Sequence, residues 1–201
     1  MTVDTNPSSL SIITYPHPTL RYKAKPIRRV DAELKAVVAR MFELMYAHRG
    51  VGLAATQVNL PLRLFIVNST GHQGEGVERV LLNPVISRPR GNEEAEEGCL
   101  SLPNVHGNVI RAKTIRFNAF DLNGQEIDEE ISGFEARIMQ HETDHLDGTL
   151  FIDRLKEGSE SELLGDIDAF ETDFRSKQRT AAIASDEQLL SELAAWEERY
   201  C

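Results

Sequence analysis

The sequence is poor in cysteine, in basic residues relative to acidic ones, and in long hydrophobic runs. Cys99 and Cys201 are its only cysteines, so no disulfide framework can form, and Cys99 is available as a thiolate in a reducing compartment. The formal net charge of -10 argues against a general nucleic-acid-binding surface, which needs clustered basic residues. No run of about 18 apolar residues occurs, so we expect no membrane-spanning helix.

The length and the first residues set expectations for organisation and location. A chain of 201 residues with 41% hydrophobic content can bury one substantial core, so we expect a single domain with an appended tail. Residues 1–7 lack the basic region and the apolar stretch of a signal peptide. These features favour a cytoplasmic location.

The stretch from Gln140 to Gly148 has the pattern of a metal site. If residues 133–147 are helical, His141 and His145 project from the same face, where two imidazoles can bind one ion. Glu142 is adjacent to the first histidine and free to handle protons there. Two neutral histidines still need at least one more protein ligand and an open position before a metal ion can activate water.

Cys99 is the candidate third ligand. It lies in a turn-rich segment between predicted strands, and a His-His-Cys set leaves a fourth position for water. Taken alone, a cysteine is more often a small buried hydrophobe, and a His-Glu-X-X-His pattern also recurs by chance. Ligand chemistry alone does not choose between iron, zinc, nickel and cobalt.

The remaining pattern predicts an α+β fold. Asp31 is the expected N-cap of a helix that ends near Gly50 and has apolar residues at helical spacing. Asn83-Pro84 should stop a strand, and Asn123-Gly124 is a hairpin signal. Strands are predicted at residues 62–67, 77–82, 114–120 and 125–131. We therefore expect mostly antiparallel sheets packed around a central metal-binding helix, with extra C-terminal helices.

Other segments carry no predicted chemistry. His17, between two prolines, is expected in a surface loop, and Glu93, Glu94 and Glu96 are expected in a solvated loop. Beyond Leu155 two amphipathic stripes predict helices for packing or oligomer contacts. A capping box at residues 185–188 opens the second of them.

Three motifs, taken together and in this order, resemble those of the peptide deformylases. They are Gly50-Val51-Gly52-Leu53-Ala54-Ala55-Thr56-Gln57, Glu97-Gly98-Cys99-Leu100-Ser101-Leu102-Pro103 and Gln140-His141-Glu142-Thr143-Asp144-His145. The resemblance runs from about Tyr15 to Leu155, so we expect a catalytic domain at 1–155 and a C-terminal helical extension at 156–201. It implies removal of the formyl group from the N-terminal formylmethionine of newly made bacterial proteins, with release of formate.

The resemblance also implies a metal centre. Cys99, His141 and His145 match the family's metal ligands. The native metal in the family is usually Fe2+, and Zn2+, Ni2+ or Co2+ can substitute. The expected partners are N-formylmethionyl nascent polypeptides, with association with the ribosome as a further expectation and no direct binding of nucleic acid or membrane.

Catalytic roles follow from the same resemblance. Glu142 matches the family's catalytic acid/base, which would take a proton from water and later deliver it to the departing amine. Gln57 and Leu100 match the groups that stabilise the charge developing on the formyl oxygen, through a side-chain N–H and a backbone N–H.

Several residues are expected to contact the substrate. Gly52 and Gly98 match positions where substrate backbone lies alongside the protein as an added strand, which requires the absence of a side chain. Val51, Phe134 and Ile138 are candidates for the pocket that holds the methionine side chain, with ordinary core packing as an equal alternative.

Two further positions complete the expected site. Glu97 and Arg111 are expected to pair behind Cys99 and fix its loop. His106 stands where family members often carry an arginine that contacts the peptide downstream of the methionine.

Two other functions share part of the pattern. An endopeptidase also uses His-Glu-X-X-His, but it usually takes a third ligand downstream, where this sequence offers only Asp144 and Asp147; these are expected to support a histidine or cap the helix. A structural metal protein would need a fourth protein ligand, for which there is no obvious candidate.

Overall fold

A computed structural model of the chain describes residues 7–156 and 160–201. The strands are β1 (Gly52–Ala54), β2 (Leu64–Val67), β3 (Arg79–Cys99), β4 (Leu102–Phe120) and β5 (Glu126–Ser132). The α-helices are α1 (Ala32–Ala47), α2 (Gly133–Leu146), α3 (Glu160–Arg179), α4 (Asp186–Ser191) and α5 (Leu193–Tyr200). Short 3-10 helices lie at η1 (Pro7–Ser9), η2 (Pro18–Arg21), η3 (Ala55–Val58) and η4 (Phe151–Arg154).

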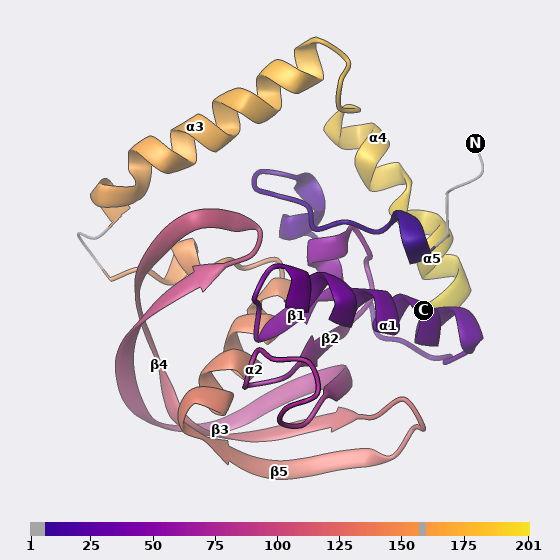
Figure 1. Cartoon of the computed structure of the whole chain (residues 1–201), viewed down its shortest axis with the longest axis vertical. Helices are drawn as coiled ribbons and strands as arrows, with labels where there is room; N and C mark the ends of the chain where they lie inside the picture. Colours follow the sequence, from indigo (N-terminus) through magenta and orange to yellow (C-terminus); the bar gives the residue numbers. More distant parts are fainter. Residues whose placement is uncertain (1–6, 157–159) are drawn as a thin grey trace.

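The strands form one antiparallel sheet in the order β1-β2-β3-β4-β5. The long strands β3 and β4 bend around α2, which lies inside the curve of the sheet (Figure 1). Apolar residues of α2, among them Ile138 and Met139, pack against Phe117 and Ile131 of the sheet. The predicted α+β class, with antiparallel strands around a central helix, is confirmed.

The central hairpin is much longer than the sequence predicts. Asn83-Pro84 does not stop the strand, because the register shifts between Leu82 and Val85 and β3 continues to Cys99. The Asn83 side chain stabilises this bulge by accepting from the Ile27 amide at 2.7 Å and donating to its carbonyl at 2.8 Å. The acidic residues predicted in a loop belong to β3, where pairing with β4 outweighs their weak strand propensity.

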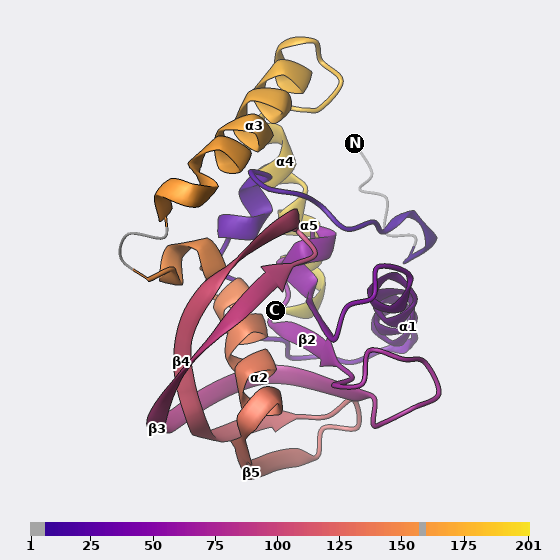
Figure 2. The same cartoon turned by 60° about the vertical axis from the view of Figure 1, so that its left-hand side comes forward.

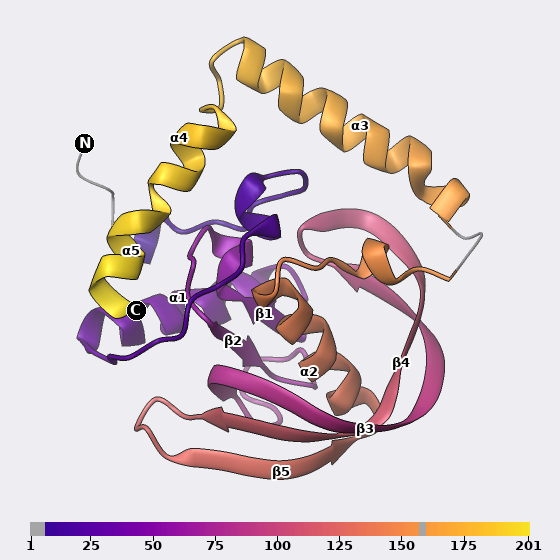
Figure 3. The same cartoon turned by 180° about the vertical axis from the view of Figure 1, so that it is seen from behind.

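Helix α1 confirms the predicted helix, with Asp31 as its N-cap accepting from the Leu34 amide at 3.0 Å. Its apolar face shares a core with Trp196 and Tyr200 of α5, and the Tyr200 hydroxyl donates to Asp31 at 3.0 Å. Helix α5 therefore lies beside α1, as seen from behind in Figure 3. The capping box is confirmed at Ser185, but the helix it opens breaks at Glu192 into α4 and α5.

His17 lies under the C-terminal helices, so its predicted place in a surface loop is wrong. The residue is 8% exposed, and its ring meets Phe174 of α3 edge-on at 6.1 Å between ring centroids. Its Nδ1 accepts from the Thr19 amide. Figure 2 shows α3 projecting above the sheet, with the N-terminal segment next to it. Within the described parts of the chain, no helix has the length and apolar character needed to cross a membrane.

Candidate active site

The turn between β3 and β4 and the helix α2 bring three possible metal donors together. Cys99 ends β3 at an irregular register, and His141 and His145 lie one turn apart on α2. The Cys99 Sγ atom is 3.3 Å from His145 Nε2, and the two Nε2 atoms are 3.3 Å apart. The predicted set is therefore assembled, with all donor atoms within 4.8 Å of one another.

These donors fit a divalent metal ion. Bonds of about 2.0 Å from nitrogen to a tetrahedral ion place two nitrogens about 3.3 Å apart. The Nδ1 atom of His141 is 2.9 Å from the Glu97 carboxylate, which leaves its Nε2 atom to face the other donors. No fourth His, Cys, Asp or Glu joins this group among the residues that the structure describes. The arrangement is that of an open site with a position left for water.

The two histidines differ in how strongly each binds a proton. Burial lowers the pKa of His141, but hydrogen bonds with Cys99 and Glu97 outweigh it and raise that pKa to about 10. Burial and the nearby His141 hold the pKa of His145 well below its ordinary value. Because a metal ion binds the neutral form of imidazole, it would displace this proton from His141.

Glu142 lies in the wall of the same site, with 4% of its surface exposed. Its Oε2 atom is buried and has no hydrogen-bond partner among the described residues. Burial raises the pKa of this carboxyl group to about 7, against the opposing charges of His141 and Arg111. A buried carboxylate with a free oxygen, whose pKa lies near neutrality, can accept and return a proton.

Gln57 is held rigidly beside Cys99. The Ala54 amide donates to its Oε1 atom at 2.8 Å, which fixes the orientation of the side-chain amide. The Nε2 atom then faces Cys99 Sγ at 3.4 Å and Ser101 Oγ at 3.3 Å. Ser101 is a contact that the sequence did not single out, although it lies within the second motif. The fixed Oε1 atom therefore keeps the Gln57 Nε2 donor pointed at the site.

A pocket of about 530 Å³ opens at these residues. All residues predicted to act in metal binding, catalysis or substrate binding line it except His145, which is 1% exposed. The others are Val51, Gly52, Gln57, Gly98, Cys99, Leu100, Phe134, Ile138, His141 and Glu142. Phe134 is 58% exposed, which is incompatible with ordinary core packing, whereas Ile138 is 4% exposed.

Both predicted substrate glycines lie against protein groups. A Cβ atom on Gly52 would lie 2.4 Å from Glu142 Oε1, so a side chain there would meet this carboxylate. A Cβ atom on Gly98 would lie 2.8 Å from the ring of His106, its cross-strand neighbour. His106 therefore stands over the Gly98 backbone at the edge of the pocket.

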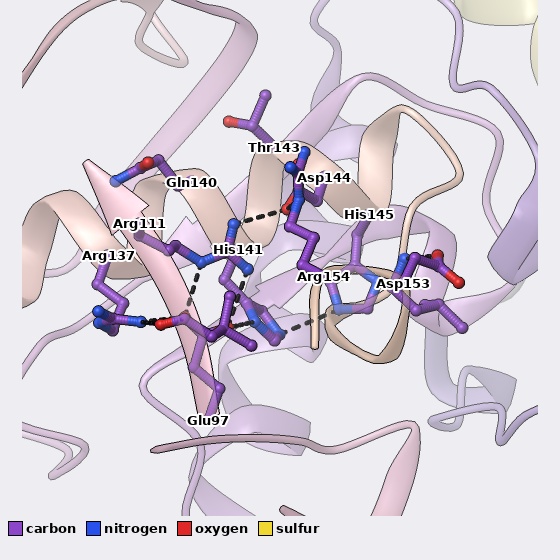
Figure 4. A network of polar contacts seen from close by, with 12 residues as sticks. Glu97, Arg111, Arg137, Gln140, His141, Thr143, Asp144, His145, Asp153 and Arg154 are labelled. Carbon is purple, nitrogen blue, oxygen red and sulfur yellow. Dashed lines mark hydrogen bonds and ion pairs between the residues drawn. The ribbon is translucent and has the colours of Figure 1, made fainter. Parts of the chain in front are cut away.

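A buried ionic network supports the donors from behind (Figure 4). The predicted pair is confirmed: Arg111 donates to both oxygens of Glu97, at 2.7 and 2.9 Å. Burial raises the pKa of Glu97, but hydrogen bonds from His141 and Arg111 outweigh it and hold that pKa well below its usual range. The sequence analysis missed Arg137, which donates to Glu97 at 2.6 Å.

The carboxylates of both aspartates after the first histidine pair with arginines. Asp144 accepts from Arg111 at 2.6 Å and from Arg154 at 2.5 Å, so the expected support of a histidine is wrong for it. Asp147 is the C-cap residue of α2 and pairs with Arg63, as the capping alternative predicted. An open three-donor site beside a buried carboxylate is the arrangement of a metal-dependent hydrolase.

Comparison with known proteins narrows this class to one family. Residues 9–161 match the family described as polypeptide deformylase. A peptide deformylase of Rhodopirellula baltica is 52% identical over 95% of both chains. Among solved structures, a plant peptide deformylase, PDF1B, superimposes with a TM-score of 0.83 and 37% identity, covering 89% of this chain and 96% of that one. A peptide deformylase from Plasmodium falciparum gives a TM-score of 0.80 at 34% identity, covering 83% and 98%.

The chain belongs to the polypeptide deformylase family. It is therefore a hydrolase of a metal-dependent family that removes the N-formyl group from nascent proteins.

Proposed function

We propose that the chain hydrolyses the formyl group of N-formylmethionyl polypeptides at the cluster of Cys99, His141 and His145, with Fe2+ as the resident ion. The main supporting observation is that His145 Nε2 lies 3.3 Å from both Cys99 Sγ and His141 Nε2, in the same site as the buried carboxylate of Glu142. Zn2+, Ni2+ or Co2+ would occupy the same donors. When bound, the ion supplies a Lewis acid that lowers the pKa of water.

Glu142 is the proposed acid/base. Its free Oε2 atom accepts a proton from the attacking water, and the same atom returns the proton to the departing amine as formate is released. Because the carboxylate is buried and in contact with Gly52, its position is defined before substrate binds. This pre-organisation keeps proton transfer within reach of the reacting carbon.

Gln57 and Leu100 are the proposed donors to the charge that develops on the formyl oxygen. The Gln57 amide is already oriented by the Ala54 backbone, so little reorganisation is needed when the charge appears. Leu100 lies in the turn next to Cys99 and lines the same pocket. Loss of one such donor typically costs about 3 kcal/mol of transition-state stabilisation.

The pocket is the proposed site of the methionine side chain. Val51, Phe134 and Ile138 provide apolar walls, and exposure of Phe134 leaves its ring free to cover a substrate. Gly52 and Gly98 are the proposed positions where substrate backbone lies alongside the protein as an added strand.

Residues 1–155 are the proposed catalytic domain and 156–201 a C-terminal helical extension, with 1–6 and 157–159 outside the described residues. The contact of α5 with α1 supports a stabilising role for this extension. We place the protein in the cytoplasm, where nascent formylated chains occur, and treat ribosome association as part of this proposal.

The decisive experiment is formate release from formyl-Met-Ala-Ser by anaerobically purified protein, beside Glu142→Ala. We expect the wild type to release formate and the variant to keep its metal while losing turnover. Cys99→Ala should lose metal. A wild type that holds a full complement of iron and releases no formate would refute the proposal.

A further inference from the structure

Arg137 is a buried cation that joins three separate parts of the site. Its NH1 atom donates to the Glu97 carboxylate at 2.6 Å and to the Val109 carbonyl at 3.0 Å, and its NH2 atom donates to the Glu93 carbonyl at 2.6 Å. These partners lie on β3 and β4, whereas Arg137 lies on α2. One side chain thus connects the metal-bearing helix to both strands of the hairpin that carries Cys99.

Arg137 also lines the pocket. It follows Phe134 by three residues and precedes His141 by four, so the three residues share one face of α2. Its side chain is 9% exposed, and its terminal nitrogens are engaged by Glu97 and the strand carbonyls. The aliphatic stem is therefore the part left to form the pocket wall next to Phe134 and Ile138.

We propose that Arg137 is a positioning residue that couples the methionine pocket to the metal donors through Glu97. Glu97 Oε1 accepts from Arg137 and Arg111, and Oε2, which also accepts from Arg111, lies 2.9 Å from His141 Nδ1. Fixing that carboxylate fixes the tautomer and the ring angle of His141, whose Nε2 atom faces the other donors. This inference rests on the proposed function, because it assumes that these donors bind a divalent ion.

The guanidinium group of Arg137 and its aliphatic stem can be tested separately. Arg137→Met keeps an unbranched apolar stem in the pocket wall but removes the contact with Glu97. Arg137→Lys keeps the positive charge but replaces the planar group with a point charge that cannot reach all three acceptors together. Arg90→Met is the matched control, since Arg90 forms an exposed ion pair with Glu130, away from the pocket.

The first measurement is Co2+ binding to metal-stripped protein by competition with a chelator, read from visible absorption of the bound ion. Co2+ affinity should fall by about 10- to 100-fold in Arg137→Met, with a changed spectrum, and by less in Arg137→Lys. The KM for formyl-Met-Ala-Ser should change much less than kcat in Arg137→Met, because the stem remains. Arg90→Met should match the wild type in all of these.

Urea unfolding of the metal-free proteins distinguishes positioning from a purely structural role. If Arg137→Met is less stable but binds Co2+ with wild-type affinity and spectrum, the proposal is wrong. If Arg137→Met does not fold, Arg137→Lys provides the test. This variant must bind Co2+ more weakly and with an altered spectrum, and wild-type affinity and spectrum would refute the proposal. A wild type that binds no Co2+ would instead overturn the proposed metal site itself.

Discussion

Replacing Gly52 with alanine should disable catalysis while leaving the fold intact. The added Cβ atom would lie 2.4 Å from Glu142 Oε1, 2.8 Å from its Cδ and 2.9 Å from its Cγ. Ordinary contacts are about 3.5 Å, so the carboxylate must move by about 1 Å. The overlapping atoms belong to a side chain and not to backbone, which makes displacement of Glu142 the easiest relief.

The magnitude follows from the role proposed for Glu142. A misplacement of about 1 Å in a catalytic group can cost about 100-fold in rate, or about 2.7 kcal/mol in activation free energy. Overpacking costs about 1–3 kcal/mol of stability, and we expect the lower end because a side chain can yield. The kcat of Gly52→Ala should therefore fall by about 100-fold, with metal content unchanged.

The assay is formate release under saturating formyl-Met-Ala-Ser, with metal content and urea unfolding measured on the same samples. Gly165→Ala in α3 is the control, since a Cβ atom there meets nothing within 4 Å. That control should keep wild-type kcat and be slightly more stable, because alanine favours a helix over glycine. Wild-type kcat in Gly52→Ala would show that the contact with Glu142 does not position the acid/base.

Three other outcomes are expected. Burial lowers the pKa of His17 from 6.5 to about 4, so the unfolded state binds one more proton than the folded state as the pH falls from about 6.5 to 4, and stability is lost over that range. The His17→Asn variant should lose less stability between pH 7.5 and pH 4.5 than the wild type, by up to about 3 kcal/mol, as measured by urea unfolding at both pH values. Trp196 packs in the core with α1 and does not line the pocket. The Trp196→Ala variant should therefore be about 3–5 kcal/mol less stable in urea unfolding, with an unchanged kcat at 25 °C. A large loss of kcat in the folded variant would contradict this expectation. Removal of the metal by a chelator should abolish formate release and lower the Tm, and added Fe2+ should restore both. An ion present at a free concentration of 100 times its Kd stabilises the folded state by about 2.7 kcal/mol, so its removal should lower the free energy of unfolding by that amount. Activity that survives complete metal removal would exclude a metal-dependent reaction.

Local sequence patterns were sufficient for the central elements of the site. A helix over residues 133–147 was expected because it would place His141 and His145 on one face, and that spacing depends only on residues close in sequence; α2 spans Gly133–Leu146. The capping roles of Asp31 and Ser185 could be predicted from the sequence for the same reason. The pairing of Glu97 with Arg111 came from the family resemblance and was confirmed.

Long-range pairing decided what the sequence analysis missed. The bulge at Asn83 lets a strand pass through Pro84, and only pairing with β4 makes that favourable. His17 is buried because α3, which begins more than a hundred residues later, returns to cover it. Arg137 has no local signal, since its acceptors come from β3 and β4.

The sequence by itself determined the kind of chemistry: two histidines, a glutamate and a cysteine in two motifs, with Gln57 in a third, identified the family and the metal donors. Only the tertiary structure decided how these groups are held, with Gly52 against Glu142 and Arg137 behind Glu97. The physical reason is that side-chain type and short spacing are local properties. The position of a catalytic atom depends instead on packing between segments that the chain brings together only when it folds.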